Sequence, residues 1–396
     1  MTLRFTWWGS DARHQRTQQV MDLFHSKHPN ITIKGEFKDW NGYWDSLATT
    51  VAANDAPDVI QMDELYLSSY ADRGALLDLK TQGTHLGLDG IDQLALATGA
   101  VDGKQYALPV GLASYSVVVN TDLLKKYGVP MPDDSKWTWD DLWAVGQRIS
   151  KASGGKVTGV QSWGMDVGGL NIWARQQGGS LYDDAGNVVV EPKAVEDLFA
   201  KMSQLSKDGV TPTPAVTVER ASGSLDQSGT ATNTSAFGFW WNTQLTALTK
   251  ASGDNLALLK LPGESAAKSP GAYYKPSMFW SISSRSKYPA EAALFLDFLA
   301  NSEEAGAILL TDRGVPANPK VRSAITPKLD ATDKAAAAYL DAITVADPPR
   351  VTPNGASGVE DLLRRHGEDV LFGRQTPAQA AKAFVDDLQK DIDSAG

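Results

Sequence analysis

Tryptophan is unusually frequent in this chain of 396 residues, which has 12 Trp beside 11 Phe and 11 Tyr. Flat aromatic rings can cover the apolar C–H faces of a polyhydroxylated ring, while a few fixed polar groups bind its hydroxyls. Hydrogen bonds to charged partners contribute about 1.5–3 kcal/mol each, so carboxylates and guanidinium groups suit hydroxyl pairs. Aromatic and charged residues that gather at one place are therefore candidates for a carbohydrate site.

Such residues follow three expected strands near the start of the chain, over residues 3–8, 31–37 and 59–62. The candidates at these strand ends are Ser10, Asp11, Arg13 and His14, then Trp40, Tyr43 and Trp44, and then Asp63 and Glu64. Asp63 is also expected to cap the helix that runs through Tyr70, and Ser10 or Asp11 could cap the first helix. One residue can both cap a helix and bind a ligand here, because these caps lie at the carboxyl ends of strands, where ligands bind in α/β sheets.

The later candidates are more scattered: Asn120, Trp163, Trp173, Trp240, Trp241, Trp280 and Arg313. Trp240 and Trp241 are neighbours in an expected strand, so one should face the sheet interior and the other a binding cleft. Core packing is the competing interpretation for every Trp, and we favour it for Trp137, Trp139 and Trp143, which flank and enter an amphipathic helix. Arg313 is either a group that closes on the ligand or a surface charge, and the sequence favours the surface charge.

The elements that position these residues alternate from the first residue onward. A strand, a helix over 11–27, a second strand, a helix over 43–53 and a third strand give the order β-α-β-α-β within about 60 residues, which predicts a doubly wound α/β sheet. Ligands bind beyond the carboxyl ends of the strands in such sheets. The chain is too long for one ordinary core, so two domains are expected.

Composition excludes several other functions. The net charge of −10 disfavours nucleic acid as a partner, and the absence of cysteine excludes disulfides, thiol catalysis and thiolate metal sites. His25 and His28 have no accompanying carboxylate pattern, so neither a metal nor a cofactor is expected. No Gly-x-Gly, phosphate-binding loop or Gly-x-Ser-x-Gly motif occurs.

The sequence has no apolar run long enough for a membrane span, and Met1 leads almost directly into the first expected strand. We expect a mature or trimmed start, from which any export signal or lipid-attachment cysteine has been removed.

A series of short motifs then runs through nearly the whole chain in order. It includes Trp7-Trp8-Gly9 with Arg13, His28-Pro29-Asn30-Ile31, Ala56-Pro57-Asp58-Val59, the segment Tyr70–Leu79, Asp102–Pro109, Asn120–Leu124, Trp137–Leu142, and Ala290–Asn301 with Arg313-Gly314-Val315-Pro316. In this series the chain resembles the carbohydrate-binding extracellular solute-binding proteins (family 1) of bacterial ABC importers. The family's Met before a Gly-rich Trp turn is absent here, where Ser235–Asn242 stands instead.

The resemblance implies a two-lobed type II periplasmic-binding-protein fold with a hinge and a ligand cleft between the lobes. It places the lobes at 1–112 plus 279–316 and at 113–278 plus 317–396, with crossings near 110–114, 275–281 and 314–317. It also implies a non-enzymatic, monomeric receptor outside the cytoplasm, in the periplasm or lipid-anchored, which closes on an oligosaccharide and delivers it to membrane permease subunits. The alternative is a glycoside-processing enzyme, because aromatic clefts with paired carboxylates also suit hydrolysis.

Overall fold

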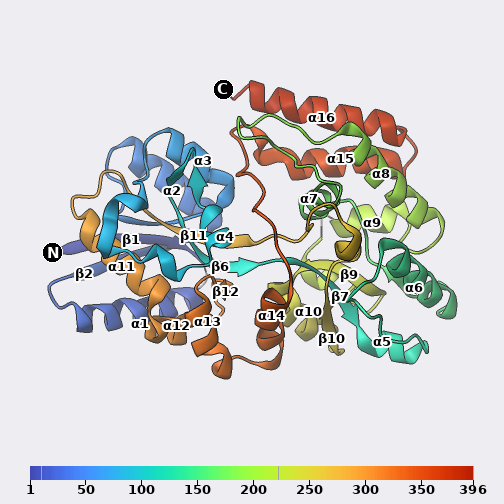
Figure 1. The fold of residues 1–396 in the computed structure, drawn as a ribbon, viewed down its shortest axis with the longest axis horizontal. Coiled ribbons are helices and arrows are strands. Elements are labelled where there is room, and N and C mark those ends of the chain that lie inside the picture. The colour runs from blue at the N-terminus through green and yellow to red at the C-terminus, as the bar shows by residue number, and fades with distance from the viewer. Residues whose placement is uncertain (10, 222, 396) are drawn as a thin grey trace. The chain divides into compact units, whose positions relative to one another are not determined.

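The computed structural model describes residues 1–9, 11–221 and 223–395, and it divides the chain into two compact units (Figure 1). Unit 1 consists of Met1–Ala113 and Tyr274–Asp330, and unit 2 consists of Ser114–Tyr273 and Ala331–Gly396. Each unit has its own sheet with helices around it, so the expected α/β class is confirmed.

Unit 1 is built on a six-stranded sheet in the order β12-β6-β11-β3-β1-β2. The strands are β1 (Thr2–Trp8), β2 (Thr32–Lys38), β3 (Val59–Met62), β6 (Leu108–Ala113), β11 (Lys275–Ile282) and β12 (Val315–Pro316). β1 pairs in parallel with both β2 and β3, whereas β11 runs antiparallel to β3 and β6. The carboxyl ends of β1, β2 and β3 therefore share one edge, and a two-stranded hairpin of β4 (Ala100–Val101) and β5 (Lys104–Gln105) lies outside the sheet.

The helices of unit 1 are α1 (Asp11–Lys27), α2 (Trp40–Ala52), α3 (Glu64–Asp72), α4 (Gln93–Ala97), α11 (Pro289–Asn301), α12 (Glu303–Leu309) and α13 (Pro319–Ile325). Figure 1 shows α1, α12 and α13 on one side of the sheet and α2 and α3 on the other. α2 and α3 begin directly after β2 and β3, and Asp39 and Asp63 cap them by accepting hydrogen bonds from the backbone N–H of Gly42 and Leu65.

Unit 2 is built on a four-stranded sheet in the order β10-β7-β9-β8. The strands are β7 (Tyr115–Asn120), β8 (Thr158–Val160), β9 (Ser235–Trp241) and β10 (Leu256–Leu259). β8 is parallel to β9, while β7 is antiparallel to β9. The end of β9 and the start of β7 therefore lie together, with Trp241 opposite Tyr115.

The helices of unit 2 are α5 (Thr121–Lys126), α6 (Trp139–Ala152), α7 (Val167–Gln176), α8 (Pro192–Lys207), α9 (Pro214–Ala221), α10 (Leu245–Ser252), α14 (Ala331–Ala342), α15 (Val359–Leu371) and α16 (Pro377–Asp393). Figure 1 shows α8, α15 and α16 side by side, and their buried residues join the core of this unit. Trp137 and Trp143 are buried in the same core, as expected from the sequence, with Trp139 packed against it.

Two expected lobe boundaries are wrong, because the second part of unit 1 runs from Tyr274 to Asp330 and not from 279 to 316. The chain was expected to leave the first lobe near 314–317, but unit 1 continues to Asp330. The reason is α13, whose Val321 and Ile325 are buried and lie against Gly306 of α12, so this helix completes the core of unit 1. The start of β11, from Lys275, also belongs to unit 1 because it pairs with β6.

Candidate functional site

The shared strand edge of unit 1 carries a cluster of aromatic rings around Trp8. Trp8 ends β1, and its ring meets Trp40 edge-on at 5.0 Å between centroids, Tyr43 at 5.2 Å and Trp44 at 5.7 Å. Trp44 also stacks on Tyr66 of α3 at 3.9 Å, with 26° between the ring planes. The end of β1 and the first turns of α2 and α3 thus bring their aromatic residues into one group. We call this group the Trp8 cluster (Trp8, Trp40, Tyr43, Trp44 and Tyr66).

Exposure separates the members of the Trp8 cluster into two kinds. Trp8 and Trp44 are each 8% exposed and Tyr43 is 1% exposed, whereas Trp40 is 38% exposed. The Tyr43 hydroxyl donates to the Gln61 carbonyl at 2.5 Å, and burial raises the Tyr43 pKa well above its usual value. Tyr43 and Trp44 therefore support the cluster from inside, and Trp40 is the ring that is open to a ligand.

Two carboxylates stand beside these rings at the start of α3. Burial and, to a smaller extent, the charge of Glu64 together raise the pKa of Asp63 to about 6, against the lowering effects of the Leu65 N–H and of Lys275. Glu64 accepts a hydrogen bond from the Lys275 ammonium group, in an ion pair that is about one-third exposed. Asp63 thus serves as a helix cap, as expected, and both carboxylates offer further acceptor positions.

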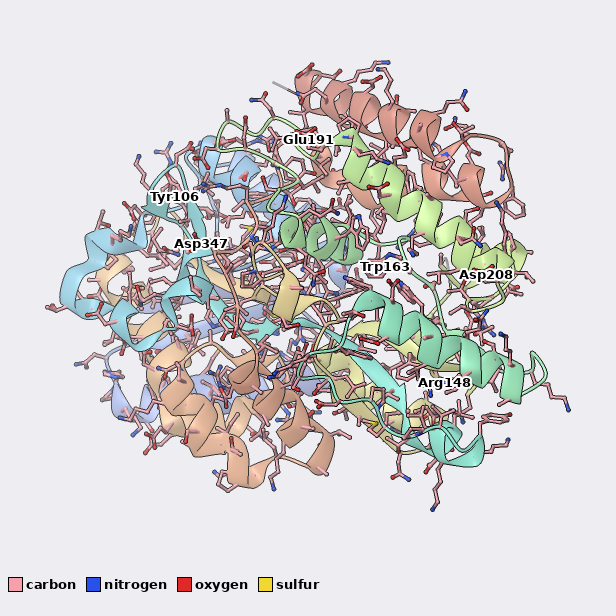
Figure 2. The ribbon with its side chains drawn as sticks, turned by 45° about the vertical axis from the view of Figure 1, so that its right-hand side comes forward. Tyr106, Arg148, Trp163, Glu191, Asp208 and Asp347 are labelled. Atoms are coloured by element: carbon pink, nitrogen blue, oxygen red, sulfur yellow. The ribbon has the colours of Figure 1, made fainter. Side chains whose placement is uncertain are left out.

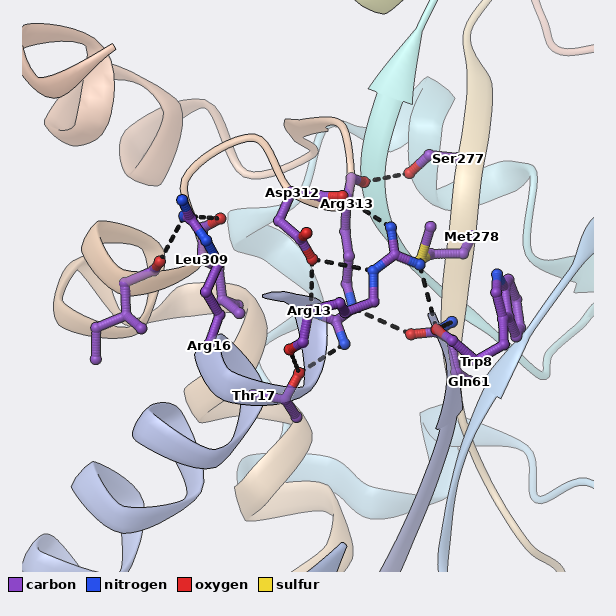
Figure 3. Close-up of polar contacts among 11 residues, drawn as sticks. Trp8, Arg13, Arg16, Thr17, Gln61, Ser277, Met278, Leu309, Asp312 and Arg313 are labelled. Atoms are coloured by element: carbon purple, nitrogen blue, oxygen red, sulfur yellow. Dashed lines mark hydrogen bonds and ion pairs between the residues drawn. The ribbon is translucent and has the colours of Figure 1, made fainter. Parts of the chain in front are cut away.

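Arg13 and Arg313 belong to a polar network behind Trp8, shown in Figure 3. Both arginines bind the Asp312 carboxylate, at 3.0 Å from Arg13 Nε and 3.1 Å from Arg313 Nη1. Arg313 also donates to Gln61 Oε1 at 3.0 Å and to Thr17 Oγ1 at 2.8 Å. It is 2% exposed, and burial, with the charge of Arg13, lowers its pKa to about 9. The expectation that Arg313 is a surface charge is therefore wrong.

The network holds the carboxyl end of β1. The Trp8 carbonyl accepts hydrogen bonds from Arg13 Nη1 and from Gln61 Nε2, both at 3.3 Å. Gln61 in turn accepts the Tyr43 hydrogen bond through its own carbonyl. Arg13 and Arg313 thus position the Trp8 cluster through the Trp8 backbone and Gln61, and neither guanidinium group lies on the exposed side of the cluster.

The remaining predicted residues of unit 1 lie outside the cluster. The His14 ring is stacked with Phe37 at 4.1 Å and with Trp7 at 5.7 Å, and Asp11 is exposed in the first turn of α1. Trp280 is 1% exposed, meets Phe5 edge-on at 5.3 Å and lies under the Arg313 guanidinium at 5.1 Å. Trp280 is therefore a core residue, and its prediction as a ligand-binding residue is corrected. Ser10 lies outside the described residues.

Unit 2 has its own aromatic group at the edge where β9 ends and β7 begins. Trp241 meets Tyr115 edge-on at 5.0 Å and Tyr273 at 6.0 Å. Gly168, in the first turn of α7, makes room for these rings, since a Cβ there would lie 3.1 Å from the Tyr115 ring and 3.2 Å from that of Trp241. Trp240 points to the other face of the sheet, where its indole N–H donates to Thr230 Oγ1 at 3.0 Å. The two neighbours alternate as predicted.

A carboxylate accompanies this second group as well. Asp166 caps α7, accepting hydrogen bonds from the Gly169 N–H at 2.8 Å and from the Tyr115 hydroxyl at 2.7 Å. Burial and the nearby Glu360 raise the pKa of Asp166 to about 6. Glu360 accepts from the Val167 N–H at 2.8 Å and pairs with Arg364 at 2.9 Å.

Three predicted residues of unit 2 have structural roles. Asn120 is fully buried, caps α5, and donates to Asn233 and Asp254 at 2.9 Å each. It ends β7, which is antiparallel to β9, so it lies at the opposite edge from Trp241. Trp163, labelled in Figure 2, is 2% exposed among the aromatic rings of the core, and the Trp173 indole N–H donates to the Ala194 carbonyl at 3.0 Å.

Sequence reasoning missed Trp8, Tyr66, Tyr115 and Asp166. Tyr66 lies in the first turn of the helix that Asp63 caps, and Asp166 precedes a Gly-Gly pair, so the capping pattern was the available signal. Among the described residues, no three His, Asp or Glu side chains form a group suited to a metal ion. No helix in the described ranges has both the length and the apolar character of a membrane span.

Comparison with known proteins identifies the family. Residues 19–338, most of the chain, match the model for bacterial extracellular solute-binding proteins, and the chain belongs to that family. The diacetylchitobiose binding protein DasA of Streptomyces coelicolor is 26% identical over 374 residues, which cover 91% of this chain and 83% of that protein.

Two solved structures support the fold. An extracellular solute-binding protein family 1 from Alicyclobacillus acidocaldarius has 28% identity and a TM-score of 0.83, with 99% of this chain and 98% of that chain covered. A periplasmic oligogalacturonide binding protein from Yersinia enterocolitica has a TM-score of 0.86 at 23% identity, with 100% of both chains covered. The resemblance to solute-binding proteins and the two-lobed periplasmic-binding fold are thus confirmed.

Proposed function

We propose that this solute-binding protein captures an oligosaccharide outside the cytoplasm, in the periplasm or at the outer face of the membrane, and delivers it to the permease subunits of an ABC importer. The observation that carries the proposal is the exposed Trp40 ring, fixed on buried aromatic residues and next to Tyr66 of α3, the helix that begins with the carboxylates Asp63 and Glu64. An exposed indole on a rigid support covers the C–H face of a sugar ring, and the carboxylates accept its hydroxyl hydrogens.

The second aromatic group supports a solute of more than one sugar unit. Trp241, Tyr115 and Asp166 in unit 2 repeat the pairing of rings with a carboxylate found in unit 1. We propose that one solute engages both groups and so favours the closed arrangement of an open–closed equilibrium. Small-angle scattering with saturating ligand is expected to show compaction, and unchanged scattering would contradict this step.

The proposed receptor is a monomer and not an enzyme. The match to DasA, a protein named for binding diacetylchitobiose, favours binding over glycoside processing. The net charge of −10 favours neither nucleic acid nor anionic lipid as a partner.

The test is a titration of the purified chain with mono- and oligosaccharides, followed by tryptophan fluorescence and calorimetry and by analysis of the sugars afterwards. We expect saturable binding with every sugar recovered intact. Recovery of cleaved sugar in excess over protein would favour the glycoside-processing alternative, and no binding to any sugar would refute the proposal.

A matched pair of variants locates the site. Trp40→Ala is expected to weaken binding at least about tenfold, equivalent to about 1.4 kcal/mol. Tyr288→Ala is the control, because Tyr288 is 39% exposed, close to the 38% of Trp40, but follows the end of β11 at the opposite edge of the sheet. Equal binding by both variants would place the site elsewhere.

A further inference from the structure

We infer that the bound oligosaccharide is uncharged and that the site rejects acidic sugars such as uronic acid oligomers. This inference rests on the proposed function and adds the chemical class of the ligand. It depends on the charges that surround the two aromatic groups, and each unit contributes to it separately.

The polar groups beside Trp40 are mainly acceptors with negative charge. Asp39 and Asp63 cap the two helices that begin at this edge, and Glu64 follows directly. The Lys275 ammonium group donates to Glu64, so these two charges balance each other, and Asp39 and Asp63 carry the remaining negative charge of this edge. Lys38 ends β2 but is exposed, where water and salt screen a single cation.

The aromatic group of unit 2 has the same character. Asp166 is held by the Tyr115 hydroxyl and the Gly169 N–H, and Glu360 pairs with Arg364 close by. Arg175 is buried, lies 5.4 Å from the centre of the Tyr273 ring, and donates to the Asp347 carbonyl at 2.6 Å. The carboxylate charges of Asp347 and Glu264, both near Arg175, offset its positive charge within the unit.

Specificity follows from these charges. The hydroxyls of a neutral sugar donate to the carboxylates, giving charge-assisted hydrogen bonds. A uronate brings a further negative charge, in place of a hydroxyl donor, to the edge where the carboxylates of Asp39 and Asp63 lie, and such like-charge contacts reject a ligand that otherwise has the right shape.

The experiment compares neutral and acidic oligosaccharides on the full chain by calorimetry. The neutral probes are diacetylchitobiose and arabino-, xylo- and cello-oligosaccharides, and the acidic probes are di- and trigalacturonic acid. The tightest neutral ligand with a primary hydroxyl is also oxidised at that position to its uronate, which keeps length and linkage the same. We expect the uronate form to bind at least about tenfold more weakly than the parent sugar.

The outcomes separate this inference from the proposed function. Equal or tighter binding of the acidic probes would overturn the inference and leave sugar capture intact. Failure of both neutral and acidic probes would refute sugar capture itself, and the inference with it.

Variants test whether the named carboxylates cause the rejection. Asp63→Asn keeps a capping side chain, and both Asp63→Asn and Glu64→Gln remove one negative charge, so each is expected to reduce the preference for neutral over oxidised sugar. Asp55→Asn is the control, since this exposed residue lies before the amino end of β3, at the other edge of the sheet. A preference that is unchanged in both site variants would show that these carboxylates do not select the ligand.

Discussion

The raised pKa of Asp63 makes a quantitative prediction about stability. A shift from 3.8 to about 6 spans about two pH units, and each unit corresponds to 1.36 kcal/mol. Because the folded state favours the protonated carboxyl, Asp63 contributes stability that is fully present below pH 4 and is lost as pH rises through 6. At neutral pH, holding this carboxylate ionised in the folded chain costs up to about 3 kcal/mol.

The substitution Asp63→Asn removes this cost while keeping the helix cap. Above about pH 7 the variant is expected to be more stable than the wild type by up to about 3 kcal/mol, and the difference should vanish near pH 4. Urea unfolding of both proteins between about pH 4 and 7.5 measures the difference, because carboxylates that do not interact with Asp63 affect both chains alike.

Asp141 supplies a control of opposite sign. Hydrogen bonds from the Thr138 side chain and backbone lower the Asp141 pKa, so Asp141→Asn should lose stability at neutral pH and recover relative to the wild type in acid. A difference between Asp63→Asn and wild type that does not vary with pH, or that grows as pH falls, would refute the assignment for Asp63.

Three further substitutions test the structural roles. Trp280→Ala should lower the free energy of unfolding by about 3–5 kcal/mol, because the ring is 1% exposed in the core; a loss below about 1 kcal/mol in urea unfolding would contradict this. Asn120→Ala should lower the free energy of unfolding by about 1–2 kcal/mol through the lost helix cap and leave sugar affinity unchanged. Weaker sugar binding in calorimetry would show that Asn120 does contribute to the binding site. Gly111→Ala should destabilise unit 1 in thermal unfolding, since its Cβ would lie 2.0 Å from the Arg313 carbonyl oxygen, and an unchanged melting temperature would oppose that.

The elements that carry hydrophobic periodicity were predictable from the sequence. The helix at Asp11–Lys27 and the strand at Val59–Met62 have the expected ends, and the other early elements differ by a few residues at most. The β-α-β order predicted that the carboxyl ends of β1, β2 and β3 share one edge. It therefore also predicted that Trp40 and Asp63, which follow β2 and β3, lie at that edge.

The candidate residues that were placed wrongly from the sequence differ mainly in burial and in the direction of their strand. Nothing local in the sequence shows that Trp280 and Arg313 face each other inside unit 1, since their contact joins residues far apart in the chain. Because β7 runs antiparallel to β9, Asn120 lies at the sheet edge opposite to that of Trp241. Only the long-range pairing of the two strands sets this direction. Gly168 and Gly169 lie in the first turn of a helix although glycine is a poor helix former, because the Asp166 side chain caps that turn.

The most direct test of the account is a calorimetric titration of wild type and Trp40→Ala with the tightest-binding neutral oligosaccharide, with Tyr288→Ala as control. We predict saturable binding by the wild type and the control, and at least about a tenfold loss of affinity in Trp40→Ala with no loss of folding. Affinity that is the same in all three proteins would contradict the claim that the exposed Trp40 ring holds a sugar.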